Sequence, residues 1–110
     1  MKLLTKSKYI AGLQCPKLLW VQYHDRDRIP EPDAMAQHLF KEGDKVGEMA
    51  KKLYPTGIDI DFGEFKNNLA KSKELLNEGK PLFEAGYIFN NCYSRADVLV
   101  PSGDAWDIVE

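Results

Sequence analysis

The sequence predicts an α+β domain in which helices come first and a three-stranded antiparallel meander follows. Two observations lead to this expectation: apolar residues recur at helical spacing up to about residue 78, and from residue 82 they alternate with polar residues. With 110 residues, 44% of them hydrophobic and 29% charged, the chain has the size and composition of one folded domain over residues 1–110.

Capping residues and prolines delimit the expected N-terminal helices. Thr5 or Ser7 caps a short helix through residues 8–11 that Gly12 ends, and Pro16 begins a second helix that continues to Tyr23. Residues 24–32 are charged and contain two prolines, which is typical of a loop. We therefore expect two short helices broken between residues 12 and 15.

A long amphipathic helix is expected from its cap, Asp33, to about Tyr54. Gly43 and Gly47 lie inside it, where glycine costs about 1 kcal/mol relative to alanine, so they indicate close packing or a bend. The apolar residues at near-helical spacing are Met35, Leu39, Val46, Met49, Ala50 and Leu53.

The second half of the chain alternates between short strands and one helix. Residues 57–61 are expected to form an edge strand, and residues 64–77 a helix that Gly79 ends. Three strands follow at residues 82–89, 93–100 and 105–109, with turns at residues 90–91 and 101–104.

Composition and charge narrow the class of protein. A net charge of -2 argues against a uniformly basic nucleic-acid coat, and the absence of a signal peptide or membrane-spanning run predicts a cytoplasmic protein outside the membrane. Two distant cysteines, Cys15 and Cys92, are expected to remain reduced. Residues 1–28 hold six Lys/Arg and two Asp/Glu, whereas residues 81–110 hold one Lys/Arg and five Asp/Glu. This uneven charge suits either anion binding beside a carboxylate-bound metal or ordinary surface variation.

The final hairpin brings two carboxylates onto one face. A two-residue turn at residues 103–104 places Asp97 opposite Glu110, whereas a turn one residue earlier leaves the two diagonal. Both arrangements suit a shared divalent cation, and both also suit two exposed acids. Glu84 is either a third ligand or a solvent-facing strand residue. Asp104 and Asp107 are expected at the turn and surface.

Four segments carry a more specific signal: residues 4–20 (LTKSKYIAGLQCPKLLW), 42–50 (EGDKVGEMA), 95–99 (RADVL) and 108–110 (IVE). They resemble the front portion of RecB-type nucleases of the PD-(D/E)XK superfamily, in the bacterial branch near the CRISPR-associated exonucleases and AddB. The resemblance implies part of a restriction-endonuclease-like core that cleaves DNA with Mg²⁺ or Mn²⁺. It makes Asp97 and Glu110 catalytic metal ligands, with Glu84 as an additional one. Three lysines are then expected to contact the nucleic-acid backbone: Lys6, Lys8 and Lys17.

The chain also departs from this family. The family's catalytic lysine would fall at the second position after Glu110, so we expect a fragment of a longer polypeptide, inactive as it stands. Gly47 replaces a metal-binding histidine of several members, and His38 is expected on the helix surface. Cys15 is similar to the first of four iron-sulfur ligands, a cluster that needs later cysteines in a longer protein; otherwise it is a small buried residue. The alternative functions are a non-catalytic nucleic-acid or protein interaction module and a purely structural domain.

Overall fold

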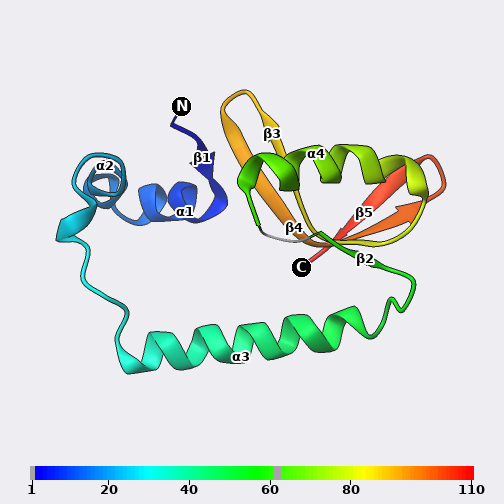
Figure 1. The fold of residues 1–110 in the computed structure, drawn as a ribbon. Helices are drawn as coiled ribbons and strands as arrows, with labels where there is room; N and C mark the ends of the chain where they lie inside the picture. The colour runs from blue at the N-terminus through cyan, green and yellow to red at the C-terminus, as the bar shows by residue number, and fades with distance from the viewer. Residues whose placement is uncertain (1, 61–62) are drawn as a thin grey trace.

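A computed structural model describes residues 2–60 and 63–110 and confirms the α+β class. Helices α1 and α2 lie at one side of the sheet, α4 crosses one face of it, and α3 runs apart from both (Figure 1). The elements in chain order are β1 (Leu4–Thr5), α1 (Lys6–Gln14), α2 (Pro16–His24), η1 (Arg26–Arg28), α3 (Ala34–Lys51), β2 (Ile58–Asp59), α4 (Phe65–Leu75), η2 (Leu76–Glu78), β3 (Leu82–Phe89), β4 (Cys92–Ser102) and β5 (Ala105–Val109).

The first two helices break where the sequence predicted. Thr5 caps α1 by accepting a hydrogen bond from the Lys8 amide at 3.3 Å, and α2 begins at Pro16. The prediction that Gly12 ends α1 is wrong, because the helix continues to Gln14. A Cβ at Gly12 would lie 2.8 Å from Leu19 Cδ2, so this glycine lets α2 approach α1.

Helix α3 begins as expected at the cap Asp33, whose side chain accepts from the Ala36 amide at 2.8 Å. Close packing at Gly43 and Gly47 is not found, because a Cβ at either position would meet nothing within 4 Å. The expected loop before α3 contains the short helix η1. The apolar residues of α3 are largely exposed, from 61% at Leu39 to 66% at Met35, and Figure 1 shows the helix standing away from the sheet.

The sheet contains the predicted meander β3-β4-β5 and two additional short strands. Its order is β1-β4-β3-β2, with β5 also pairing with β4. The expected edge strand at residues 57–61 forms as β2, which pairs parallel to β3; Asp61 lies outside the described residues. Strand β1 pairs parallel to β4 through Leu4 and Cys92, which sequence periodicity did not indicate.

Both hairpins turn through residues with positive φ. Asn90 and Asn91 have φ angles of 47° and 61°, and Gly103 has 60°. Two-residue hairpin turns favour this left-handed backbone because it matches the twist of the flanking strands. The pairing of Ser102 with Ala105 shows that the second turn consists of residues 103–104.

The core lies between α4 and the sheet. Its buried cluster consists of Ile60, Leu82, Ala85, Ala96 and Leu99. Leu75 of α4 and Leu76 of η2 are among the partly buried residues that pack against it. Two polar α4 residues, Asn68 and Ser72, are also buried. The Ser72 hydroxyl accepts from the Gly86 amide at 2.9 Å, so hydrogen bonds as well as apolar contacts attach α4 to β3.

We expect Gly86→Ala to destabilise the fold by about 1–3 kcal/mol, because overpacking forces neighbouring groups to move. The new Cβ would lie 2.6 Å from Asn68 Oδ1 and 2.8 Å from the Tyr93 hydroxyl. The control is Gly43→Ala in open space on α3, which should stabilise by about 0.5–1 kcal/mol through helix propensity. Urea unfolding measures both; equal effects of the two variants would contradict this packing.

Candidate acidic site between α3 and the sheet

The β4–β5 register determines how the two predicted carboxylates lie. Val98 pairs with Val109, and the hairpin turns through residues 103–104. Because the strands are antiparallel, the residue before Val98 lies opposite the residue after Val109, which sets Asp97 opposite Glu110. This is the first of the two registers expected from the sequence. Both side chains line the same cavity.

A third carboxylate extends this pair into a row across three strands. Phe83 pairs with Val98 and Ala85 with Ala96, which places Glu84 opposite Asp97. The side chain of Glu84 lines the same cavity as the other two. We refer to Glu84 of β3, Asp97 of β4 and Glu110, which directly follows β5, as the acidic row.

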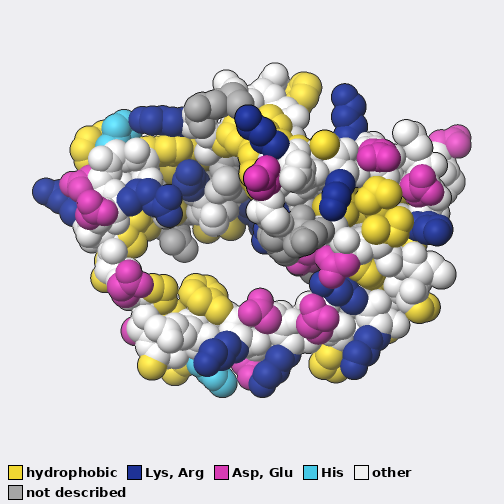
Figure 2. Space-filling view, viewed as in Figure 1, with side chains coloured by type: hydrophobic (Ala, Val, Ile, Leu, Met, Phe, Trp, Pro, Cys, Tyr) yellow, Lys and Arg dark blue, Asp and Glu magenta, His cyan; other side chains and the backbone are white. Residues whose placement is uncertain are grey.

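The cavity in front of the acidic row is open to solvent, and α3 forms the wall opposite the row. Its volume is about 730 Å³, within the range of ligand sites. Gly43, Val46, Gly47 and Ala50 of α3 contribute to its wall. Figure 2 shows an open space between α3 and the rest of the molecule. The absence of side chains at the two glycines widens this space.

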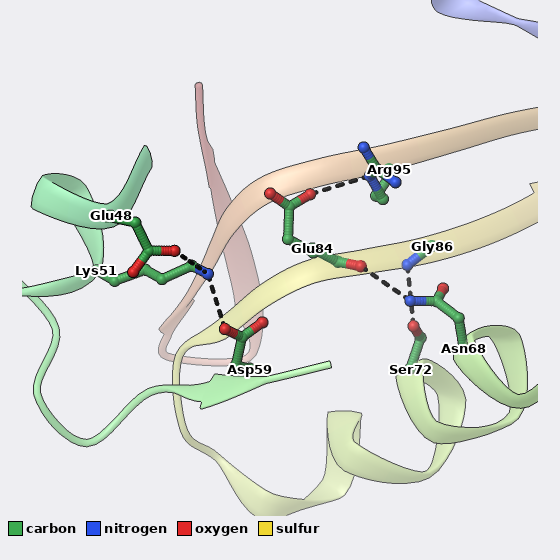
Figure 3. A network of polar contacts seen from close by, with 8 residues as sticks. All are labelled: Glu48, Lys51, Asp59, Asn68, Ser72, Glu84, Gly86 and Arg95. Atoms are coloured by element: carbon green, nitrogen blue, oxygen red, sulfur yellow. Dashed lines mark hydrogen bonds and ion pairs between the residues drawn. The ribbon is translucent and has the colours of Figure 1, made fainter. Parts of the chain in front are cut away.

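The backbone of Glu84 is distorted within its strand. Its φ of 62° is left-handed, a conformation that costs a non-glycine residue roughly 1–2 kcal/mol. The Glu84 carbonyl accepts from Asn68 Nδ2 of α4 at 3.2 Å. The β3–β4 register is the same before and after Glu84, so the distortion inserts no extra residue into the strand. Figure 3 shows the Glu84 carboxylate on the far side of β3 from Asn68 and Ser72.

The side chain of Glu84 is partly buried, with 22% of it exposed in the open cavity. One oxygen, Oε2, forms an ion pair with Arg95 Nε at 2.9 Å (Figure 3), but without hydrogen-bond geometry. Burial raises the pKa of the Glu84 carboxyl above its usual 4.5; Arg95 opposes this rise and the charge of Asp97 adds to it. A carboxyl in this state is readily protonated or drawn to a cation.

Glu110, at the other end of the row, is neutralised by Lys6. The Lys6 ammonium forms an ion pair and a hydrogen bond with Glu110 Oε2. The hydrogen bond and charge of Glu110 raise the pKa of Lys6, with a smaller contribution from Asp97. Both partners are exposed, Lys6 by 64% and Glu110 by 39% of the side chain, so solvent screens their attraction.

The donor set of the row suits a hard divalent cation, because Mg²⁺ and Mn²⁺ favour carboxylate oxygens. Among the residues that the structure describes, no three acidic, histidine or cysteine side chains converge closely enough to hold a metal. The outer acids instead contact cations, Glu84 with Arg95 and Glu110 with Lys6. The row therefore carries oxygen donors of the type that such ions favour, and its two outer carboxylates contact side-chain cations.

The sequence argument missed two cations that line the cavity, Arg95 and Lys51, and the contact that a third, Lys6, makes with Glu110. Arg95 was detectable, because it lies two positions before Asp97 and strand alternation puts both on one face. Lys51, which bonds Asp59 at 2.7 Å and Glu48 at 3.2 Å (Figure 3), links α3 to β2. Lys6 was expected to bind nucleic acid, and no pattern in the sequence indicated that it contacts Glu110.

The remaining predicted site residues lie in different environments. Lys8 Nζ lies 4.4 Å above the Tyr23 ring, and Lys17 is exposed on α2. His38 is exposed on α3 as expected. Asp104 and Asp107 are exposed, as expected for turn and surface residues.

The two cysteines are free, as expected, and both are exposed. The alternative of Cys15 as a small buried residue is therefore wrong. Cys15 is the N-cap of α2, and Cys92 is the first residue of β4. Within residues 2–60 and 63–110, no helix has the length and apolar character needed to cross a membrane.

No protein-family model, curated protein or solved structure matches this chain. The family resemblance therefore rests on the four quoted segments.

Replacing Glu84 tests the backbone distortion. Glu84→Gly should be more stable than Glu84→Ala by about 1 kcal/mol, because glycine adopts positive φ without the steric cost that alanine retains. The two variants remove the same carboxylate, so their difference isolates the backbone. If residue 84 had an extended backbone, Glu84→Ala would be the more stable variant. That result in urea unfolding would contradict a left-handed Glu84.

The raised pKa of Glu84 predicts a pH-dependent stability. Folding strengthens proton binding at this carboxyl, so its contribution to the free energy of unfolding is fully present below pH 4.5 and is lost as the pH rises through the folded-state pKa. Relative to Glu84→Gln, the wild type should lose stability over that window. Urea unfolding of both proteins between acidic and neutral pH measures the difference; a constant difference would exclude the shift.

Proposed function

We propose that this chain supplies the carboxylates of a metal-dependent DNA nuclease site of the RecB type. The observation that carries the proposal is the acidic row: Glu84, Asp97 and Glu110 lie on three adjacent strands and line one cavity. The two positions that the resemblance names as metal ligands, Asp97 and Glu110, are directly opposed. A site of this kind would belong to a cytoplasmic enzyme acting on nucleic acid.

In this proposal Asp97 and Glu110 hold Mg²⁺ or Mn²⁺, and Glu84 adds a third carboxylate. The metal would supply water activation and stabilisation of charge on the scissile phosphate. The protein would hold the carboxylates on a rigid sheet, which is more precise than holding them on loops. Arg95, which lines the same cavity, offers a positive group for the phosphate.

The basic helices provide the second part of the argument. Lys6, Lys8 and Lys17 belong to α1 and α2, beside the end of the sheet where β1 pairs with β4. Lysines attract a polyanionic backbone without reading its sequence. This distribution supports DNA as the partner, because Lys6 contacts Glu110 and so brings the positive charge of these helices next to the acidic row.

A non-catalytic interaction module is the second candidate. The specific observation in its favour is that cations contact both outer acids, Lys6 at Glu110 and Arg95 at Glu84. Such a module would keep the fold and bind nucleic acid or protein without a metal. Metal binding separates the two candidates.

We expect the wild type to bind Mn²⁺ and Asp97→Asn to bind it at least about tenfold more weakly, a loss of about 1.4 kcal/mol, because the central ligand of the row is removed. Electron paramagnetic resonance of free Mn²⁺ measures binding, and circular dichroism checks the fold. The matched control is Asp104→Asn, which removes the same charge in the exposed turn at the far end of the hairpin. Equal Mn²⁺ affinity of wild type and Asp97→Asn would reject the metal site.

Cleavage is tested separately on linear DNA with Mg²⁺ or Mn²⁺. The chain itself should show little or no cleavage, because the resemblance places a catalytic lysine at the second position after Glu110. A form lengthened by two residues that ends in lysine would present this side chain on the same strand face as Glu110, because strand faces alternate. Cleavage that depends on both this lysine and Asp97 would support the enzyme; binding of DNA without cleavage would favour the interaction module.

A further inference from the structure

Lys6 meets the acidic row from a distant part of the chain. Its ammonium bonds Glu110 and lies close enough to Asp97 to interact with that charge. Two of the three carboxylates of the row are thus under the influence of one exposed cation.

The fold holds Lys6 at this place. Leu4 and Thr5 pair with Cys92 and Tyr93 of β4, and Lys6 follows directly as the first residue of α1. The Tyr23 hydroxyl donates to the Leu3 carbonyl at 2.8 Å, which ties α2 to the same segment. Strand β1, which precedes Lys6, and strand β5, which precedes Glu110, both pair with β4, so backbone pairing brings the two residues together.

We propose that Lys6 is a built-in competitor for the divalent cation, which must give up Glu110 before a metal can bind there. This inference rests on the proposed metal site. The ammonium occupies Glu110 Oε2, and an oxygen engaged by an ammonium is a poorer ligand for a second cation at the same place. Charge acts in the same direction, because an ammonium beside the row repels an incoming dication.

Because the metal and Lys6 compete for Glu110, metal binding and release of Lys6 are reciprocal. Whatever free energy the Lys6 contact contributes is lost when the metal binds, and by linkage the metal releases Lys6 to the same extent. The freed ammonium would remain tethered at the edge of the cavity, where it can contact an anionic phosphate. Metal binding would in this way prepare a contact for the nucleic-acid backbone.

Three lysine variants test the inference by Mn²⁺ binding. Lys6→Gln should bind Mn²⁺ about two- to fivefold more tightly than the wild type, the range expected for losing an exposed ion pair. Lys6→Arg keeps the charge and should bind no more tightly than the wild type. Lys8→Gln is the matched control, because it removes the same charge from α1 at a residue that lies over Tyr23, and it should leave the affinity nearly unchanged.

A second readout follows Lys6 itself. In nuclear magnetic resonance with diamagnetic Mg²⁺, the side-chain signals of Lys6 should shift on titration in the wild type but not in Asp97→Asn. Urea unfolding and circular dichroism establish that each variant is folded. If Lys6→Gln does not fold, Lys6→Met serves as an alternative neutral variant.

The outcomes separate this inference from the proposed function. Tighter binding by Lys6→Gln but not by Lys8→Gln supports both, including the case in which only Lys6→Gln binds measurably. Equal Mn²⁺ affinities of wild type and Lys6→Gln, both lost in Asp97→Asn, overturn the competition and leave the metal site standing. Weaker binding by Lys6→Gln also overturns it. Failure of all folded variants to bind Mn²⁺ rejects the metal site and the inference together.

Discussion

The backbone hydrogen bonds of β4 organise the molecule, because this strand pairs with β1, β3 and β5. Two short turns, at Asn90-Asn91 and Gly103-Asp104, fix the register on its two antiparallel sides. A change of one residue in either turn would move an outer carboxylate to the opposite face of the sheet. The acidic row is therefore a consequence of turn chemistry. Its separation from the α4 core depends on the left-handed backbone of Glu84, because strict alternation would put Glu84 on the same face as the core residue Leu82.

Local features were predictable from the sequence and distant contacts were not. Thr5, Asp33 and Gly79 mark helix ends, and alternation marks the meander, because these signals depend on neighbours within a few residues. The pairing of Asp97 with Glu110 was accessible for the same reason, since one hairpin spans both residues. The short parallel strand β1 was not predicted, because its two paired residues are too few to show an alternating pattern.

The wrong expectation about Gly12 and the unexpected backbone of Glu84 both have physical causes. Gly12 was expected to end a helix, yet its lack of a side chain is used for contact with Leu19. The left-handed backbone of Glu84 leaves no trace in the sequence, because its neighbours alone would permit an extended strand. The contact of Lys6 with Glu110 joins the two ends of the chain, and a distant ion pair of this kind depends on the complete fold.

The detachment of α3 has a consequence for how the molecule moves. This helix is joined to the sheet edge by the Lys51–Asp59 ion pair, and its apolar side chains are exposed. An 18-residue helix with so little tertiary support is marginal in water, so its amides should open to solvent exchange at a much lower free energy than those of β3 and β4. One wall of the cavity is then less stable than the sheet that carries the acidic row, and local opening of that helix would widen the cavity.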